Sequence, residues 1–199
     1  MKSHTRNILL IALVAGTLGA VASFIVSGPG PLLRTEAGQR ALQAVLSRSA
    51  PKPPAGIRVA SRGEPIPDLR LPGLEGEPVT LPSAYAGRPL LINVWATWCG
   101  PCIREMPELE RFSVEQAPNG VQVVGIALDE ALAVQDFLTR TPVSYPILVD
   151  APGPADAGVR LGNLKGVLPY SVLVSADGRV LKQRIGPFTE GEITSWAKP

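Results

Sequence analysis

The stretch that decides the fold is Trp98-Cys99-Gly100-Pro101-Cys102, which contains both cysteines of the 199-residue chain. Two thiols separated by two residues can close a disulfide and open it again. The residues before this stretch, 90–96, form a short apolar run of the kind that is buried on both faces of a sheet. Pro101 suits the first turn of a helix, because the N–H that proline lacks would be unpaired there in any case. The sequence therefore predicts a strand, then the two cysteines, then a helix.

The apolar pattern on both sides of the cysteines predicts an α/β domain. After them, Ile103, Met106, Leu109 and Phe112 recur at helical spacing. Strand-like and helix-like segments then alternate, and an antiparallel hairpin lies near the end of the chain. The expected strands are two short ones between residues 67 and 81, then 90–96, 121–128, 147–149, 170–174 and 180–185, and the expected helices are 101–116, 131–140 and one from about residue 189. Residues 63–199 are long enough for one domain with a sizeable core.

The two cysteines have different expected roles. The thiolate is the attacking species in disulfide exchange, and Cys99 lies at the expected helix N-terminus, where unpaired N–H groups and the helix dipole favour an anion. Cys102 lies one turn further in, so we expect Cys99 to be the nucleophile and Cys102 to resolve the mixed disulfide. A structural disulfide is a poorer explanation, because closing so short a loop gains little entropy. Zinc needs about four ligands, but the chain has no third cysteine and its one histidine, His4, lies in the N-terminal tail. We therefore expect no metal and no other cofactor.

The block from Asn93 to Cys102, with Glu105 and Pro107 after it, resembles the TlpA/ResA-type thiol-disulfide oxidoreductases. These are membrane-tethered, thioredoxin-like proteins that work outside the cytoplasm. The resemblance covers residues 63–199. It implies a thioredoxin-like α/β fold with a central mixed sheet flanked by helices and an N-terminal strand lead-in. It also implies an inserted unit around residues 125–150, between the helix that follows the cysteines and the strand that follows a cis proline.

The resemblance further implies a surface for client proteins around the cysteines. It places a cis proline beside them at Pro169, where the backbone of Leu168 would be held outward to pair with an extended client segment. Trp98 would flank the reactive sulfur and contact the client, although ordinary packing at the strand end would also explain an aromatic residue there. Pro101 is expected on the same surface, and the Gly-Pro pair that thioredoxin shares favours a reductant over an oxidase.

A group that accepts the proton of Cys102 is harder to identify. Thioredoxin has a buried aspartate where this chain has Asn93, and an amide cannot act as a base. Relatives of the TlpA/ResA type place a glutamate after the next strand, and Glu130 matches that position best; partial burial near a thiol would raise its pKa. Alternatively, Asp129 caps the helix 131–140 and Glu130 only fills its first turn. Glu105 is expected to be a solvated helix carboxylate.

The N-terminal residues predict export from the cytoplasm. Residues 8–26 are apolar and uncharged, and at 1.5 Å per residue they span roughly 28 Å, near the hydrocarbon thickness of a bilayer. We expect a membrane anchor at 1–27, a Pro-rich basic spacer at 28–62 and the thioredoxin-like domain at 63–199. A cleaved signal peptide is the alternative, because Ala20-Val21-Ala22 has the small-residue pattern of a cleavage site. Either form places the domain in the periplasm or otherwise outside the cytoplasmic membrane.

The charge of the chain is divided unevenly along it. Residues 1–62 contain eight Lys and Arg and one acidic residue, a net +7, whereas residues 63–199 contain eleven and sixteen, a net −5. The acidic domain has no basic face and no nucleic-acid motif. Nucleic acid is therefore not an expected partner.

The sequence favours a membrane-anchored thiol-disulfide reductase. Its expected partners are client proteins with disulfides and, as the resemblance implies, a membrane thiol-electron transporter that returns electrons to the dithiol. Clients in this family include the cysteines of apocytochrome c and of copper sites. A disulfide oxidase or isomerase is one alternative, which a strongly oxidising potential would favour. A copper-handling dithiol module is another, which stoichiometric copper binding without disulfide turnover would favour.

Overall fold

A computed structural model describes residues 33–116 and 120–198. The chain divides into two compact units, Met1–Leu42 and Gln43–Pro199. Of the first unit, residues 33–42 are described, and they include the start of helix α3 (Glu36–Arg48), which continues into the second unit. The anchor expected at residues 8–26 lies outside the described residues. In the part of the chain that is described, every helix is too short or too polar to cross a bilayer.

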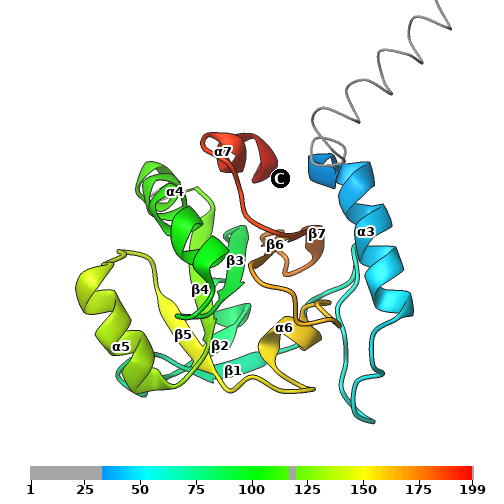
Figure 1. The fold of residues 1–199 in the computed structure, drawn as a ribbon, viewed down its shortest axis with the longest axis horizontal. Helices are drawn as coiled ribbons and strands as arrows, with labels where there is room; N and C mark the ends of the chain where they lie inside the picture. Colours follow the sequence, from blue (N-terminus) through cyan, green and yellow to red (C-terminus); the bar gives the residue numbers. More distant parts are fainter. Residues whose placement is uncertain (1–32, 117–119, 199) are drawn as a thin grey trace, which may run out of the picture. The chain divides into compact units, whose positions relative to one another are not determined.

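The second unit is built on a mixed five-stranded sheet with the order β5-β4-β3-β6-β7 (Figure 1). The strands in this order are β5 (Ile147–Asp150), β4 (Gln122–Leu128), β3 (Leu90–Trp95), β6 (Tyr170–Val174) and β7 (Val180–Ile185). Strand β3 pairs in parallel with β4 and antiparallel with β6. All residues of β3 are buried, as expected for the apolar run before the cysteines. The predicted thioredoxin-like α/β fold is confirmed.

Helices cover both faces of the sheet, and the sheet separates two apolar clusters. They are α4 (Gly100–Gln116), α5 (Ala131–Arg140), α6 (Ala157–Arg160) and α7 (Glu192–Trp196). Successive residues of β3 point to opposite faces, so Leu91 and Trp95 pack with α4, α5 and α7, whereas Ile92 and Val94 pack with α6 and the N-terminal strands. Both cysteines belong to the first of these clusters. Figure 1 shows α4 and α5 on the same side of the sheet.

A hairpin precedes the sheet, as the sequence predicts. Strands β1 (Leu69–Pro72) and β2 (Pro78–Leu81) pair antiparallel and form a separate small sheet, followed by the short 3-10 helix η1 (Ser83–Tyr85). Gly73, at the start of the hairpin turn, forms an antiparallel bridge with Leu148 of β5. Helix α5 and strand β5 occupy the stretch predicted as an insertion, and β5 becomes an edge strand of the main sheet.

Residues before the expected domain boundary also contact the domain. The amide of Ala60 donates to the carbonyl oxygen of Arg160 at 2.8 Å, and Ala60 is buried. In α3, the side-chain amide of Gln43 donates to the hydroxyl of Tyr170 at 3.0 Å, and that hydroxyl donates to the carbonyl oxygen of Leu161. The division at residues 62 and 63 stays a prediction, but the segment before it is more than a free spacer.

Candidate active site

Cys99 and Cys102 form a disulfide where β3 ends and α4 begins, with an S–S distance of 2.00 Å. Two backbone hydrogen bonds hold Cys99: its amide donates to the carbonyl oxygen of Ala96, and its own carbonyl oxygen accepts from the amide of Ile103. Cys99 keeps 5% of its surface exposed, whereas Cys102 has none. Cys99 is therefore the better candidate for the thiol that a client meets first.

The start of α4 favours negative charge on Cys99. The backbone N–H of Cys102 donates to the sulfur of Cys99 at 3.3 Å. Gly100 begins a helix of 17 residues, whose N-terminal N–H groups and dipole stabilise an anion at this end. Both effects stabilise a thiolate relative to a thiol once the disulfide is reduced.

The residues expected to contact clients differ in how exposed they are. The Trp98 side chain is 69% exposed, so it is free to contact another protein. Pro101 and Leu168 are half-buried, and Leu168 packs against the cluster that contains both cysteines. The peptide bond between Leu168 and Pro169 is cis, in agreement with the resemblance. Client contacts by these residues stay predictions.

Glu130 does not have the environment that its expected role requires. It is exposed, occupies the N-cap position of α5, and its side chain makes no capping hydrogen bond. The partial burial that would prepare it to exchange protons near neutral pH is therefore not found. Its role as a proton acceptor stays a prediction without structural support.

Asp129 does not cap α5 but connects two loops. Its carboxylate accepts hydrogen bonds from the Thr97 amide at 3.1 Å, from the Thr97 hydroxyl at 2.5 Å and from the Glu130 amide at 2.9 Å. Burial raises the pKa of Asp129, but these hydrogen bonds outweigh it and hold the pKa below its usual value. Asp129 thereby fixes the backbone two residues before Cys99.

The structure places a buried carboxylate, Glu105, on the helix that carries the cysteines. The expectation that Glu105 is solvated is wrong: the residue is 2% exposed. Its two oxygens accept hydrogen bonds from Nδ2 of Asn93 at 2.8 Å and from the Phe188 amide at 2.9 Å. Cys102 and Glu105 are three residues apart, so they lie on one face of α4 about one turn from each other.

Burial gives Glu105 an unusual pKa. Removal from water disfavours the charged form and raises the pKa of Glu105 to about 7. The hydrogen bonds from Phe188 and Asn93 and the charge of Arg184 act in the opposite direction without outweighing burial. A carboxyl group with such a pKa can both accept and release a proton near neutral pH.

Asn93 connects Glu105 with the strand after the cis proline. Its Nδ2 donates to Glu105 and, at 3.1 Å, to the hydroxyl of Ser171 in β6. The sequence contains a signal for this arrangement: Asn93 interrupts an apolar run that is buried on both faces, and a buried amide needs polar partners. The partner of the Asn93 amide is Glu105, although the helical pattern predicts that this carboxylate is exposed to solvent.

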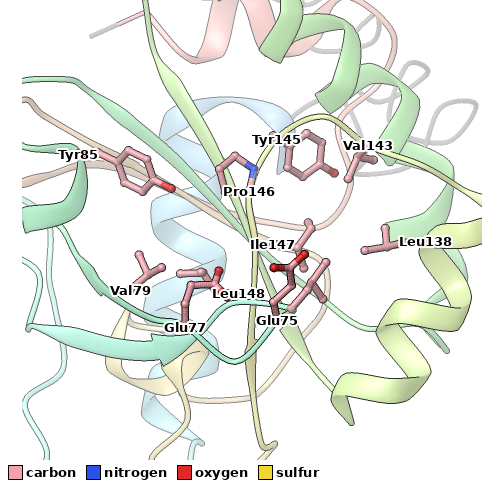
Figure 2. A pocket seen from close by; sticks show the side chains of 11 residues that line it. Glu75, Glu77, Val79, Tyr85, Leu138, Val143, Tyr145, Pro146, Ile147 and Leu148 are labelled. Atoms are coloured by element: carbon pink, nitrogen blue, oxygen red, sulfur yellow. The ribbon is translucent and has the colours of Figure 1, made fainter.

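A pocket elsewhere on the domain does not belong to this site. It has a volume of about 410 Å³ and lies between the β1–β2 hairpin, η1, α5 and the start of β5. Figure 2 shows its apolar floor, with Glu75 and Glu77 at the hairpin side. Neither cysteine, nor Glu105, nor Pro169 lines it. The dithiol site lies apart from this pocket, and of its two cysteines only Cys99 keeps any exposed surface.

A thioredoxin-like fold with one disulfide of two close cysteines at a helix start defines a thiol-disulfide oxidoreductase. Comparison with known proteins agrees with this class. The chain belongs to the Redoxin family, whose family model matches residues 61–197.

Individual relatives support the same assignment. The chain is 33% identical over 135 residues to "Thiol-disulfide oxidoreductase ResA" of Halalkalibacterium halodurans, covering 66% of this chain and 73% of the relative. It is 26% identical over 129 residues to "Sporulation thiol-disulfide oxidoreductase A" of Bacillus subtilis, covering 63% and 74%. Among solved structures, the thioredoxin-related protein of Neisseria meningitidis serogroup B matches with a TM-score of 0.56 and 36% identity, covering 63% of this chain and 93% of that one.

Proposed function

We propose that this chain reduces disulfides of client proteins outside the cytoplasmic membrane. The observation that carries the proposal is the pairing of a helix-start disulfide, Cys99–Cys102, with the buried carboxylate of Glu105 one turn further along α4. The names of its ResA relatives, which are thiol-disulfide oxidoreductases, support disulfide exchange. The Gly-Pro pair between the cysteines supports the reducing direction.

The proposed reaction starts from the dithiol form. The Cys99 thiolate attacks one sulfur of the client disulfide, a mixed disulfide forms, and the second client sulfur leaves as a thiolate. The Cys102 thiolate then attacks the sulfur of Cys99 and releases the first client sulfur. Two electrons pass to the client, which becomes a dithiol, and the Cys99–Cys102 disulfide is the oxidised product.

Glu105 takes the proton of Cys102 in this scheme. A thiol must lose its proton before it resolves the mixed disulfide, and Cys102 is fully buried, away from bulk water. The carboxylate on the same face of α4, with a pKa of about 7, is the described group best suited to accept that proton. We therefore propose Glu105, in place of Glu130, as the proton acceptor.

A second round of reduction needs electrons from elsewhere. We propose a membrane thiol-electron transporter as their source, with residues 8–26 holding the enzyme at the same membrane. The apolar, uncharged character of that stretch and its basic flank support this arrangement. Cysteines of apocytochrome c or of copper sites are the client classes that we propose to test first.

A trapping variant tests the reaction. Cys102→Ser removes the resolving thiol, so Cys99 should remain in a mixed disulfide with its client, which is released by reductant and identified. Cys99→Ser is the matched control and should trap no client at Cys102, because that residue is buried. Equal trapping by both variants, or by neither, in the exported full-length chain contradicts the proposal.

The redox potential tests the direction. A Cys99–Cys102 couple of about −270 mV, the potential of thioredoxin, supports reduction, whereas a value of about −120 mV is that of a dedicated oxidase. The second result would overturn the direction while leaving disulfide exchange intact.

A further inference from the structure

Arg184 of β7 is a buried cation in the apolar layer beneath α4 and α7. It is 2% exposed. Its guanidinium forms a bidentate ion pair with the Glu192 carboxylate, with N···O distances of 2.8 and 3.1 Å. It also donates to the carbonyl oxygen of Pro187 at 2.9 Å. Its Nε has no partner among the described residues. Burying a charge with an unmatched donor costs stability, so a stabilising role alone explains Arg184 poorly.

The sheet register aligns Arg184 with the buried polar groups of the site. Asn93 of β3 lies opposite Ser171 of β6, and Ser171 lies opposite Arg184 of β7. Residues directly opposite one another in a sheet share a face. The three therefore form one polar row across the sheet, and Glu105 reaches that row from α4 through its hydrogen bond to Asn93.

Phe188 connects Arg184 with Glu105 by a second route. The guanidinium carbon of Arg184 lies 4.6 Å from the centre of the Phe188 ring, and the Phe188 amide donates to Glu105. The Pro187 carbonyl oxygen, also bound by Arg184, belongs to the preceding residue. Arg184 thus contacts the groups on both sides of the Phe188 N–H that binds Glu105. These groups are the Pro187 carbonyl oxygen and the Phe188 ring.

We propose that Arg184 is a positioning residue for Glu105: it holds the Phe188 amide on the carboxylate and places a positive charge beside it. The inference rests on the proposed role of Glu105 and adds the group that adjusts it. Within residues 33–116 and 120–198, Tyr145 from the loop before β5 also interacts with Glu105, Cys102 lies about one turn earlier on the same helix, and Glu192 is paired with Arg184. The positive charge of Arg184 favours the charged form of the Glu105 carboxylate.

Two variants of the same ion pair separate this role from a purely structural one. Arg184→Gln removes the cation, whereas Glu192→Gln removes its partner and keeps the cation. The Glu105 carboxyl carbon is followed by NMR in the oxidised full chain across a pH series, with its signal assigned by its loss in Glu105→Gln. Because the cysteines are in the disulfide form, they do not titrate.

Arg184→Gln should raise the titration midpoint of Glu105 by about one pH unit, the size of effect expected from one nearby charge and one disturbed hydrogen bond. Glu192→Gln should leave it at or below the wild-type value. Arg184→Lys keeps the positive charge but loses the planar, bidentate guanidinium. The Glu105 midpoint of this variant should therefore lie between those of wild type and Arg184→Gln. This third variant also serves if Arg184→Gln does not fold.

A merely structural ion pair would shift the Glu105 midpoint in the same direction in the Arg184→Gln and Glu192→Gln variants, and that result overturns the inference. An unchanged midpoint in both Arg184 variants also overturns it. The readout does not depend on turnover. The Glu105 midpoint could change as expected in the Arg184 and Glu192 variants while Cys102→Ser traps no client. That combination would refute the proposed function and leave the role of Arg184 standing.

Discussion

Glu105→Gln is the substitution whose effect on stability can be worked out from the structure in most detail. The pKa of Glu105 is raised from 4.5 to about 7, so the folded protein binds this proton more tightly than the unfolded chain. Its stabilising contribution is present in full below pH 4.5 and is lost as the pH rises through about 7. At 1.36 kcal/mol per pKa unit, the wild-type protein loses about 3 kcal/mol over this range.

Glutamine cannot titrate, so the variant does not share this loss. The free energy of unfolding of Glu105→Gln minus that of wild type should therefore rise by about 3 kcal/mol between pH 4.5 and pH 8.5. The altered hydrogen bond to Asn93 adds an offset, but that offset is the same at every pH. Groups that titrate in both proteins cancel in the difference.

Urea unfolding of both proteins at a series of pH values, without reductant, measures this difference. Glu190→Gln, an exposed position before α7, is the matched control and should match wild type throughout the series. A difference for Glu105→Gln that is flat with pH would refute the reasoning about burial. In the reduced protein, the same variant should resolve a mixed disulfide about 100-fold more slowly at pH 7, since a positioned general base contributes at least that factor.

Three further changes test other parts of the structure. Asp129→Asn should lower the free energy of unfolding by about 1 kcal/mol at pH 7. The pKa of Asp129 is lowered in the folded protein, so this loss should fade as the pH falls through that pKa. Urea unfolding at pH 3 to 7 would measure the change. Trp98→Ala should leave stability within about 0.5 kcal/mol but reduce kcat/KM about tenfold for a protein client and not for a small disulfide. Gly125→Ala would place a methyl group 2.5 Å from Cδ1 of Ile147, and thermal unfolding should show a loss of about 1–3 kcal/mol that Ile147→Val, which removes Cδ1, partly restores.

The elements around the cysteines could be predicted because their burial is simple. Strand β3 is buried along its whole length, so its apolar run has no competing interpretation. Helix α5 has the predicted bounds, and the final hairpin has the predicted strands, because a turn at Asp177-Gly178 separates two short runs. Gly178 has φ 84°, a conformation that glycine adopts without strain.

The burial of Glu105 could not be predicted from the apolar pattern of the helix. That pattern begins at Ile103, so the expected buried face is defined by Ile103 and does not include Glu105. The buried face of α4 consists of Cys102, Glu105, Met106, Leu109 and Phe112, whereas Ile103 is half-buried. A carboxylate is normally exposed, so the pattern alone does not place it inside. The amide of Asn93, within a buried strand, is the stronger signal, because it requires a polar partner in the core.

Arg184 and Phe188 could not be assigned from local patterns. The partners of Arg184 lie beyond the turn after β7, and its neighbour in the sheet row, Ser171, lies on another strand. Such contacts depend on strand register, which emerges only when the whole sheet is assembled.

The burial of Glu105 separates two demands that evolution makes on such an enzyme. Trp98, the residue proposed to meet the client, is exposed before the start of α4, whereas Glu105 is buried on the inner face of the same helix. Substitutions on the exposed surface around Trp98 can therefore accumulate without changing the burial that raises the pKa of Glu105.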